Sequence, residues 1–146
     1  MQFTTQTDYA LRTLMYLATR TDRAHVSDVS NLFGISTHHV AKVVNQLAKY
    51  GYILSVRGVG GGIQLARRPE QIRLGEVIEK FEGNLHLLDC IDKENVCAIQ
   101  SFCKLKGVLA EAERLQLAYL NGVTLADVIP KPRELNSIDP SSMKRI

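Results

Sequence analysis

The stretch of sequence that decides the fold is residues 27–66, SDVSNLFGISTHHVAKVVNQLAKYGYILSVRGVGGGIQLA. Its first part predicts a short helix capped by Ser27 and ending at Phe33, because apolar residues recur there at helical spacing. Gly34 follows, and glycine readily adopts the left-handed conformation that ends a helix. Ser36 then caps a second helix, and two helices joined by so short a turn predict a helix-turn-helix.

The second helix is expected from Thr37 to about Tyr50, with a regular apolar stripe on one side. Its other side carries polar residues that can hydrogen-bond to base edges or phosphates, and the N-terminal turn of a recognition helix enters the major groove. A solvated amphipathic helix would show similar residues, so this pattern alone also fits an ordinary surface helix. The candidate DNA contacts on this helix and its cap are Ser36, Thr37, His38, His39, Lys42 and Asn45.

A run of glycines follows this helix between two short apolar segments. Residues 52–57 and 63–66 predict strands, and residues 58–62 predict the loop between them. A phosphate-cradling loop would need a helix after the glycines, so the second strand argues against nucleotide binding. A helix-turn-helix followed by a β-hairpin is a winged helix, in which Arg57 and Gly58 at the base of the wing are candidate DNA contacts.

Charge is distributed unevenly along the 146 residues. Residues 1–69 hold eight Lys or Arg against three Asp, whereas the remainder holds ten basic against twelve acidic residues. We expect the basic half to meet a polyanion, and Arg67 and Arg68 just beyond the wing can add phosphate contacts. The N-terminus lacks the features of a secretory signal, and no apolar run is long enough to span a membrane, so a cytoplasmic protein is expected.

Three more helices are predicted outside residues 27–66. One covers about residues 7–20, a short one about 74–81, and the longest about 102–121. The longest helix has a broad apolar face that needs a partner. The same helix of a second subunit could cover it, and the resulting two-fold dimer would match the symmetry of palindromic DNA sites. Packing of that face against its own chain is the alternative. From residue 130 the prolines and serines predict a loose tail.

The cysteines of the chain, Cys90, Cys97 and Cys103, all lie within one short segment. An odd number cannot close a complete set of intrachain disulfides, and gaps of six and five residues disfavour a zinc ribbon or a thioredoxin-like pair. One shared metal centre or cluster fits best, with structural zinc or three unrelated thiols left open. A thiol redox enzyme would need an activating His or cation beside a resolving Cys. Lys93 and Lys104 are near the cysteines in sequence, but no substrate pocket is suggested.

Four features occur together in this chain. They are TDYALR at residues 7–12, GIS at 34–36, RGVGGG at 57–62, and the three clustered cysteines. In combination they resemble the IscR/NsrR family of iron–sulfur winged-helix transcriptional regulators, over about residues 1–129. Within it the chain looks most like the nitric-oxide-sensing repressors, which carry an acid where this chain has Asp8. The other subgroup carries a His three residues after the third cysteine, where this chain has Lys106.

The resemblance implies a transcriptional repressor, not an enzyme, that binds a double-stranded DNA operator as a homodimer. Cys90, Cys97 and Cys103 would hold one iron–sulfur cluster per subunit, 4Fe-4S more readily than 2Fe-2S, and Asp8 of the partner subunit would supply the remaining ligand. Nitric oxide would be the signal, with cluster status or redox state as the alternative. From the residues alone, Asp8 equally fits a charge that stabilises its helix and pairs with Arg12. Rival ligands are His86, Asp89, Asp92 and Glu94.

The expected chain is therefore mainly α, with a small β-hairpin wing. Its expected parts are a winged-helix DNA-binding domain (1–82), a cluster-binding loop (83–104), a dimerisation helix with a C-terminal turn (105–129) and a flexible tail (130–146). DNA recognition and signal detection would thus occupy different parts of one chain.

Overall fold

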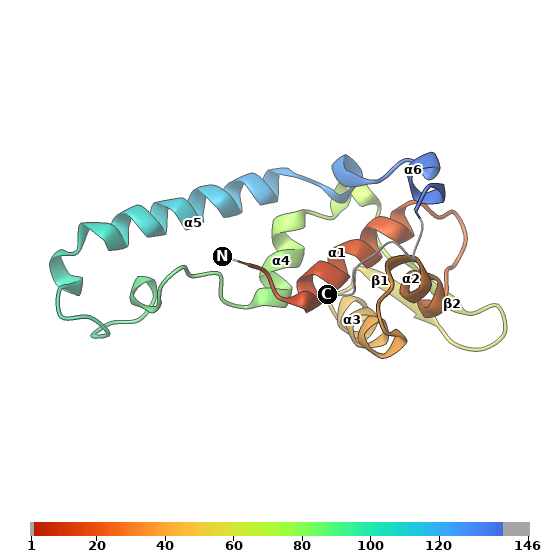
Figure 1. Ribbon diagram of the computed structural model, residues 1–146, viewed down its shortest axis with the longest axis horizontal. Coiled ribbons are helices and arrows are strands. Elements are labelled where there is room, and N and C mark those ends of the chain that lie inside the picture. The colour runs from red at the N-terminus through yellow and green to blue at the C-terminus, as the bar shows by residue number, and fades with distance from the viewer. Residues whose placement is uncertain (1, 139–146) are drawn as a thin grey trace.

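The helices and strands of this computed structural model follow the predicted order, and residues 2–138 are described. The elements are α1 (Thr5–Ala18), α2 (Val26–Phe33), α3 (Thr37–Lys49), β1 (Ile53–Val56), β2 (Gly62–Leu65), α4 (Leu74–Glu82), α5 (Lys104–Gly122) and α6 (Pro132–Asn136). Figure 1 shows α1 to α3 and the hairpin gathered at one end, with α5 reaching away from them. From residue 5 to 122 each predicted helix and strand lies within two residues of its expected limits.

The helix-turn-helix forms where it was predicted, with one difference at its start. Gly34 adopts the left-handed conformation (φ 63°), and the Ser36 side chain accepts the His39 backbone N–H at 3.2 Å. The prediction that Ser27 caps α2 is wrong, because the helix begins at Val26 and its N-cap is His25, two residues before Ser27. The Asp28 carboxylate accepts the His25 N–H at 2.6 Å and so satisfies a donor that would otherwise be unpaired.

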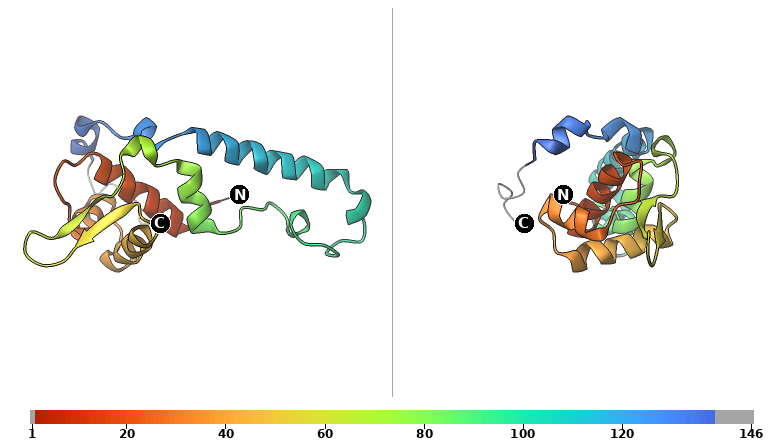
Figure 2. Two further views of the ribbon diagram at one scale, coloured as in Figure 1. Left: turned by 180° about the vertical axis from the view of Figure 1, so that it is seen from behind. Right: turned by 90° about the vertical axis from the view of Figure 1, so that its right-hand side faces the viewer.

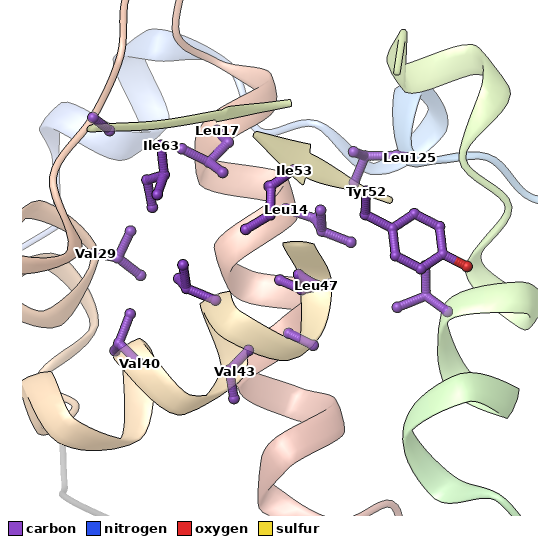
Figure 3. Packing of buried hydrophobic residues seen from close by; sticks show 14 of the residues in the cluster. Leu14, Leu17, Val29, Val40, Val43, Leu47, Tyr52, Ile53, Ile63 and Leu125 are labelled. Atoms are coloured by element: carbon purple, nitrogen blue, oxygen red, sulfur yellow. The ribbon is translucent and has the colours of Figure 1, made fainter. Parts of the chain in front are cut away.

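The core of the winged helix lies between α1, α3 and the hairpin (Figure 3). Leu14 of α1 and Leu47 of α3 are fully buried, and Tyr52 and Ile53 close the core at the start of β1. Each such side chain contributes roughly 1.5–3 kcal/mol through burial. The apolar periodicity of α1 and α3 therefore fixes how the outward face of α3 is presented.

The wing is a two-stranded antiparallel hairpin whose register runs from Ile53 opposite Leu65 to Val56 opposite Gly62. Ala24 adds a short bridge to β2, exchanging two backbone hydrogen bonds with Ile63 at 3.0 and 2.7 Å. Gly62 has a φ of 139°, and a Cβ there would lie 2.7 Å from the Ala24 carbonyl oxygen, so this crossing requires glycine.

The long helix α5 packs on α4 over part of its length. Gly75 of α4 is buried at this crossing, where a Cβ would overlap the side chain of Asn121. Figure 2 shows the segment between α4 and α5 reaching to the end of the molecule opposite the wing, where α5 begins. No helix among residues 2–138 is long and apolar enough to cross a membrane.

The C-terminal segment differs from the loose tail expected from residue 130. Pro132–Asn136 form the short helix α6, and the Lys131 N–H donates to the Glu134 carboxylate at 2.6 Å as its cap. Proline at the first helical position explains this start, since its missing N–H has no partner there in any case. The rest of the expected tail, residues 139–146, lies outside the described residues.

Candidate DNA-binding surface and cysteine loop

The polar face of α3 is open to solvent. Val40 and Leu47 point into the core, whereas the residues on the opposite face of α3 are accessible to solvent. All six candidate DNA contacts on α3 and its cap are exposed: Ser36, Thr37, His38, His39, Lys42 and Asn45. The structure therefore presents these residues on the solvent-exposed face of the second helix of the helix-turn-helix.

Ser30 links α2 to the turn and to the start of α3, a role that the sequence did not indicate. Its hydroxyl is buried and donates to the Ile35 carbonyl at 2.6 Å, and it lies 3.2 Å from the Thr37 hydroxyl. A serine inside a helix that bonds across the following turn links both helices of the motif. Thr37 consequently has a structural contact besides its exposed position.

The wing carries Arg57 and Gly58 at exposed positions, as predicted, and Val59 is fully exposed at its tip. Sequence reasoning missed Arg23, which lies in the turn before α2. Its guanidinium donates to the Gly60 carbonyl at 2.8 Å and to the Gln64 side chain at 3.2 Å. Arg23 thus ties the wing loop to the helical part of the domain.

Arg67 does not have the freedom expected of a phosphate contact. Its guanidinium lies 4.9 Å from the centre of the Tyr52 ring and 3.5 Å from a carboxylate oxygen of Glu76. Burial raises the pKa of Tyr52 and keeps its ring neutral beneath the cation. Arg67 is therefore part of the base of the wing, whereas Arg68 is exposed.

The three cysteines lie on the segment between α4 and α5. Cys90 is in a 3-10 turn, Cys97 is exposed, and Cys103 is the N-cap of α5. None of them is in a disulfide. Within residues 2–138, no three His, Cys, Asp or Glu side chains are gathered as ligands for a metal ion. The loop thus brings the thiols into one segment without forming a finished ligand group.

Asp8 lies in the first turn of α1 and pairs with Arg12, whose Nε is 2.8 Å from its carboxylate. Within one chain it is not grouped with the cysteines. Glu82, which sequence reasoning missed, lies at the end of α4 and accepts hydrogen bonds from the Thr4 N–H at 2.7 Å and from the Thr7 hydroxyl. The turn that carries Asp8 is therefore tied to the helix that leads into the cysteine loop.

The beginning of the cysteine loop is tied to α5. His86 Nδ1 lies 2.9 Å from the Glu113 carboxylate, which also accepts the Leu87 N–H. The hydrogen bond with Glu113 raises the pKa of His86. Burial would raise the pKa of Glu113, but the bonds from His86 and Leu87 lower it overall. A cavity of about 830 Å³ adjoins this pair between α4 and α5, with Glu82 and Leu117 among its lining residues.

One face of α5 exposes large apolar side chains. No residue of this helix is buried, although α4 covers part of it. The exposed fractions are 56% for Leu105, 64% for Val108, 55% for Leu115 and 74% for Tyr119. Steps of three, seven and four residues place these side chains in one line along the helix, a spacing typical of helix pairs.

A profile of the Rrf2 family, described as iron-dependent transcriptional regulators, matches residues 3–131. The chain belongs to the Rrf2 family. Among curated relatives of this Rrf2 regulator, the HTH-type transcriptional regulator NsrR of Shouchella clausii is 40% identical over 141 residues, which cover 94% of this chain and 95% of the relative. The NsrR of Bacillus subtilis is 37% identical over 138 residues, covering 92% and 94%.

Solved structures of other regulators share the fold. CymR of B. subtilis, described as the global cysteine regulator, superposes with a TM-score of 0.73 at 20% identity and covers 88% of this chain and 96% of its own. IscR of T. potens gives a TM-score of 0.69 at 24% identity, covering 99% and 93%. The winged-helix fold predicted for this Rrf2 protein is confirmed, and the protein is a DNA-binding transcriptional regulator rather than an enzyme.

Proposed function

We propose that this Rrf2 regulator is a cytoplasmic homodimeric repressor whose affinity for operator DNA depends on an iron–sulfur cluster that reacts with nitric oxide. The observation that carries the proposal is the set of three thiols, none of them in a disulfide, on one solvent-accessible loop that leads directly into α5. The description of the family as iron-dependent supports it, as does the similarity to regulators named NsrR.

The donor set suits such a cluster. Thiolates are the soft ligands that iron–sulfur clusters require, and Cys90, Cys97 and Cys103 would supply three of them. Cys103 caps α5, so the negative charge of a ligated thiolate would lie at the N-terminus of a helix, where the dipole favours anions. When bound, the cluster supplies iron that a small molecule such as nitric oxide can attack. A 4Fe-4S cluster, one per subunit, is proposed ahead of 2Fe-2S.

Asp8 of the partner subunit is proposed as the remaining ligand. Within its own chain Asp8 has Arg12 as partner, so ligation would exchange this ion pair for a bond across the dimer. The exchange would move the first turn of α1, which packs against α3. Tyr9, the next residue, has its ring centre 6.4 Å from that of His39. A change in the state of the cluster would thereby be transmitted to the recognition helix as a movement of α1.

The proposed dimer forms through α5. An exposed apolar line runs along this helix, formed by Leu105, Val108, Leu115 and Tyr119. The same line on a second subunit would bury it, and the resulting dimer would have two-fold symmetry. Two recognition helices would then lie about one DNA turn apart on a palindromic operator. The exposed face of α3 would contact base edges in the major groove. Arg57 and Gly58 of the wing would contact the DNA phosphate backbone or the minor groove.

The test is the visible spectrum of protein purified without oxygen, with iron and sulfide counted before and after nitric oxide is added. Operator affinity is measured in parallel on a DNA fragment selected from a random-sequence pool by the cluster-loaded protein. We expect a coloured protein that nitric oxide bleaches as DNA binding is lost. A protein that stays colourless after anaerobic reconstitution would refute the cluster.

A second candidate function is regulation by cluster supply, as the similarity to IscR in fold suggests. It differs in its signal, because loss of the cluster rather than nitric oxide would change DNA affinity. Comparison of apo, cluster-loaded and nitric-oxide-treated protein on the same fragment separates the two functions. Equal affinity of the loaded and treated forms, with a different affinity for the apo form, would favour the second.

A further inference from the structure

Gln100 contacts the backbone of all three cysteines. Its side-chain Nε2 donates to the Cys90 carbonyl at 3.0 Å. Its own backbone N–H donates to the Cys97 carbonyl at 3.1 Å, and its carbonyl accepts the Cys103 N–H at 3.5 Å. One residue between the second and third cysteine is thus bonded to each of them.

The side chain of Gln100 makes two further bonds inside the loop. Nε2 also donates to the Lys93 carbonyl at 2.5 Å, and Oε1 accepts the Val96 N–H at 3.1 Å. Carbonyl oxygens accept and backbone N–H groups donate, so these partners require a donor and an acceptor on one side chain. An amide meets this requirement, whereas a carboxylate or a thioether of similar length does not.

Apolar packing does not define the path of this loop. Every one of residues 89–104 is exposed or half-buried, including the apolar Val96 and Ile99. Opening a segment without buried side chains costs little free energy from lost apolar burial. The polar bonds therefore determine how well ordered the segment is. The backbone bonds of Gln100 belong to ordinary turns that other residues would also form. The three side-chain bonds are specific to glutamine.

We propose that Gln100 is the positioning residue that sets the backbone of this loop so that Cys90, Cys97 and Cys103 can bind one thiophilic centre. The inference rests on the proposed function, because that function makes the three thiols ligands of a single group. Gln100 would not bind the thiophilic centre itself. It holds backbone groups of the loop, including those of the cysteines, and side-chain rotation would then bring the thiols together. Outer contacts of this kind typically change metal affinity about 10- to 100-fold.

Arsenite binding to the metal-free, reduced, full-length protein tests this without any cluster. Arsenite binds three thiols as they displace its three hydroxyl groups as water, so its affinity reports whether three thiols can meet one atom. We expect Gln100→Met and Gln100→Glu each to weaken arsenite binding about 10- to 100-fold. Gln116→Met is the matched control, because it makes the same chemical change on α5 outside the loop and should leave the affinity unchanged.

Hydrogen exchange adds a second measurement at the residue concerned. The Val96 N–H should exchange faster in Gln100→Met, which removes its acceptor, than in the wild type. The loop lies outside the apolar core, so the unfolding midpoint of all variants should stay within a few degrees of the wild type. A large fall in the midpoint of the Gln100 variants, with unchanged arsenite affinity, would show a general structural role and overturn the inference.

The remaining outcomes separate this inference from the proposed function. Equal arsenite affinity in the wild type and both Gln100 variants would overturn the role of Gln100, even if the protein takes up a cluster. A wild type that engages fewer than three thiols per arsenite would overturn it as well. A wild type that binds arsenite through three thiols in a Gln100-dependent way, but never assembles a cluster, would support the inference while the proposed cofactor fails.

Discussion

The winged helix and the cysteine loop are ordered by different forces. Residues from α1, α3 and the hairpin bury a continuous apolar cluster, in which Leu14 and Leu47 are inaccessible to solvent. The cysteine loop has no fully buried side chain between residues 89 and 104 and depends on polar bonds, many of them to Gln100. A DNA-binding domain with a buried apolar core is thus joined to a loop held mainly by polar bonds, an arrangement that suits the proposed switch.

The largest expected effect tests the rigid part. Leu14→Ala removes a fully buried side chain from the centre of the winged helix and should lower the free energy of unfolding by about 2–5 kcal/mol. Urea unfolding of the metal-free protein measures it. Val96→Ala in the loop is the comparison, and because Val96 is 49% exposed it should cost far less. Similar costs for both variants would contradict the contrast between the two regions.

Cys97→Ser tests the sensing part. Serine keeps the size of the side chain but removes a soft ligand, so the iron retained after anaerobic reconstitution should fall more than about tenfold. The unfolding midpoint of the metal-free protein should stay unchanged, since Cys97 is exposed and bonds to no other side chain in the described structure. Iron that stays bound at the wild-type level would remove Cys97 from the proposed ligands.

Removal of surface charge tests the DNA face. Lys42→Ala and Arg57→Ala should weaken operator binding and each reduce the salt dependence of the affinity by about one phosphate contact. Lys80→Ala is the control, because Lys80 is an exposed basic residue that belongs to α4 and not to α3 or the wing. If all three substitutions weaken binding equally, general attraction rather than local contact explains it. Unchanged affinity in both test variants would refute the assigned surface.

The same contrast explains how far the sequence predicts the molecule. The periodicity of the stripe that includes Val40 and Leu47 is a local pattern, so α3 and its caps were predicted nearly to the residue. Glu82 and Arg23 each act through two or more hydrogen bonds to residues far away in sequence, and no local pattern signals such contacts. Arg67 was expected to be free because its basic character is visible in sequence, whereas its position over Tyr52 is not.

The candidate site was predictable in composition and less so in geometry. The sequence places three thiols in one short segment, and in the structure that segment lies between α4 and α5. The three thiols would meet only around a bound group. The proposed Asp8 ligand would come from a second subunit. Neither arrangement can therefore be seen in the sequence or in a single chain. Gln100 could have been suspected as a polar residue between ligands, but its bonds depend on the three-dimensional path of the loop.

The smallest expected effect concerns the pH dependence of the tie between His86 and Glu113. The hydrogen bond that His86 donates to the Glu113 carboxylate raises the pKa of His86 above its ordinary value of 6.5, so the contribution to stability is complete below pH 6.5. It is lost as the pH rises through the folded-state pKa. Glu113 has a lowered pKa, so its share is present above its ordinary value of 4.5 and is lost as the pH falls below that. The tie is therefore strongest between these two values.

A double-mutant cycle with His86→Gln and Glu113→Gln, followed by urea unfolding at pH 5.5 and pH 8.5, measures this coupling. The coupling between the two residues should be favourable at the lower pH and close to zero at the higher one, because neutral His86 leaves a hydrogen bond without opposite charges. His86 is partly exposed, which keeps the effect small through solvent screening. A coupling that is equal at both pH values would mean that charge plays no part in holding the loop to α5.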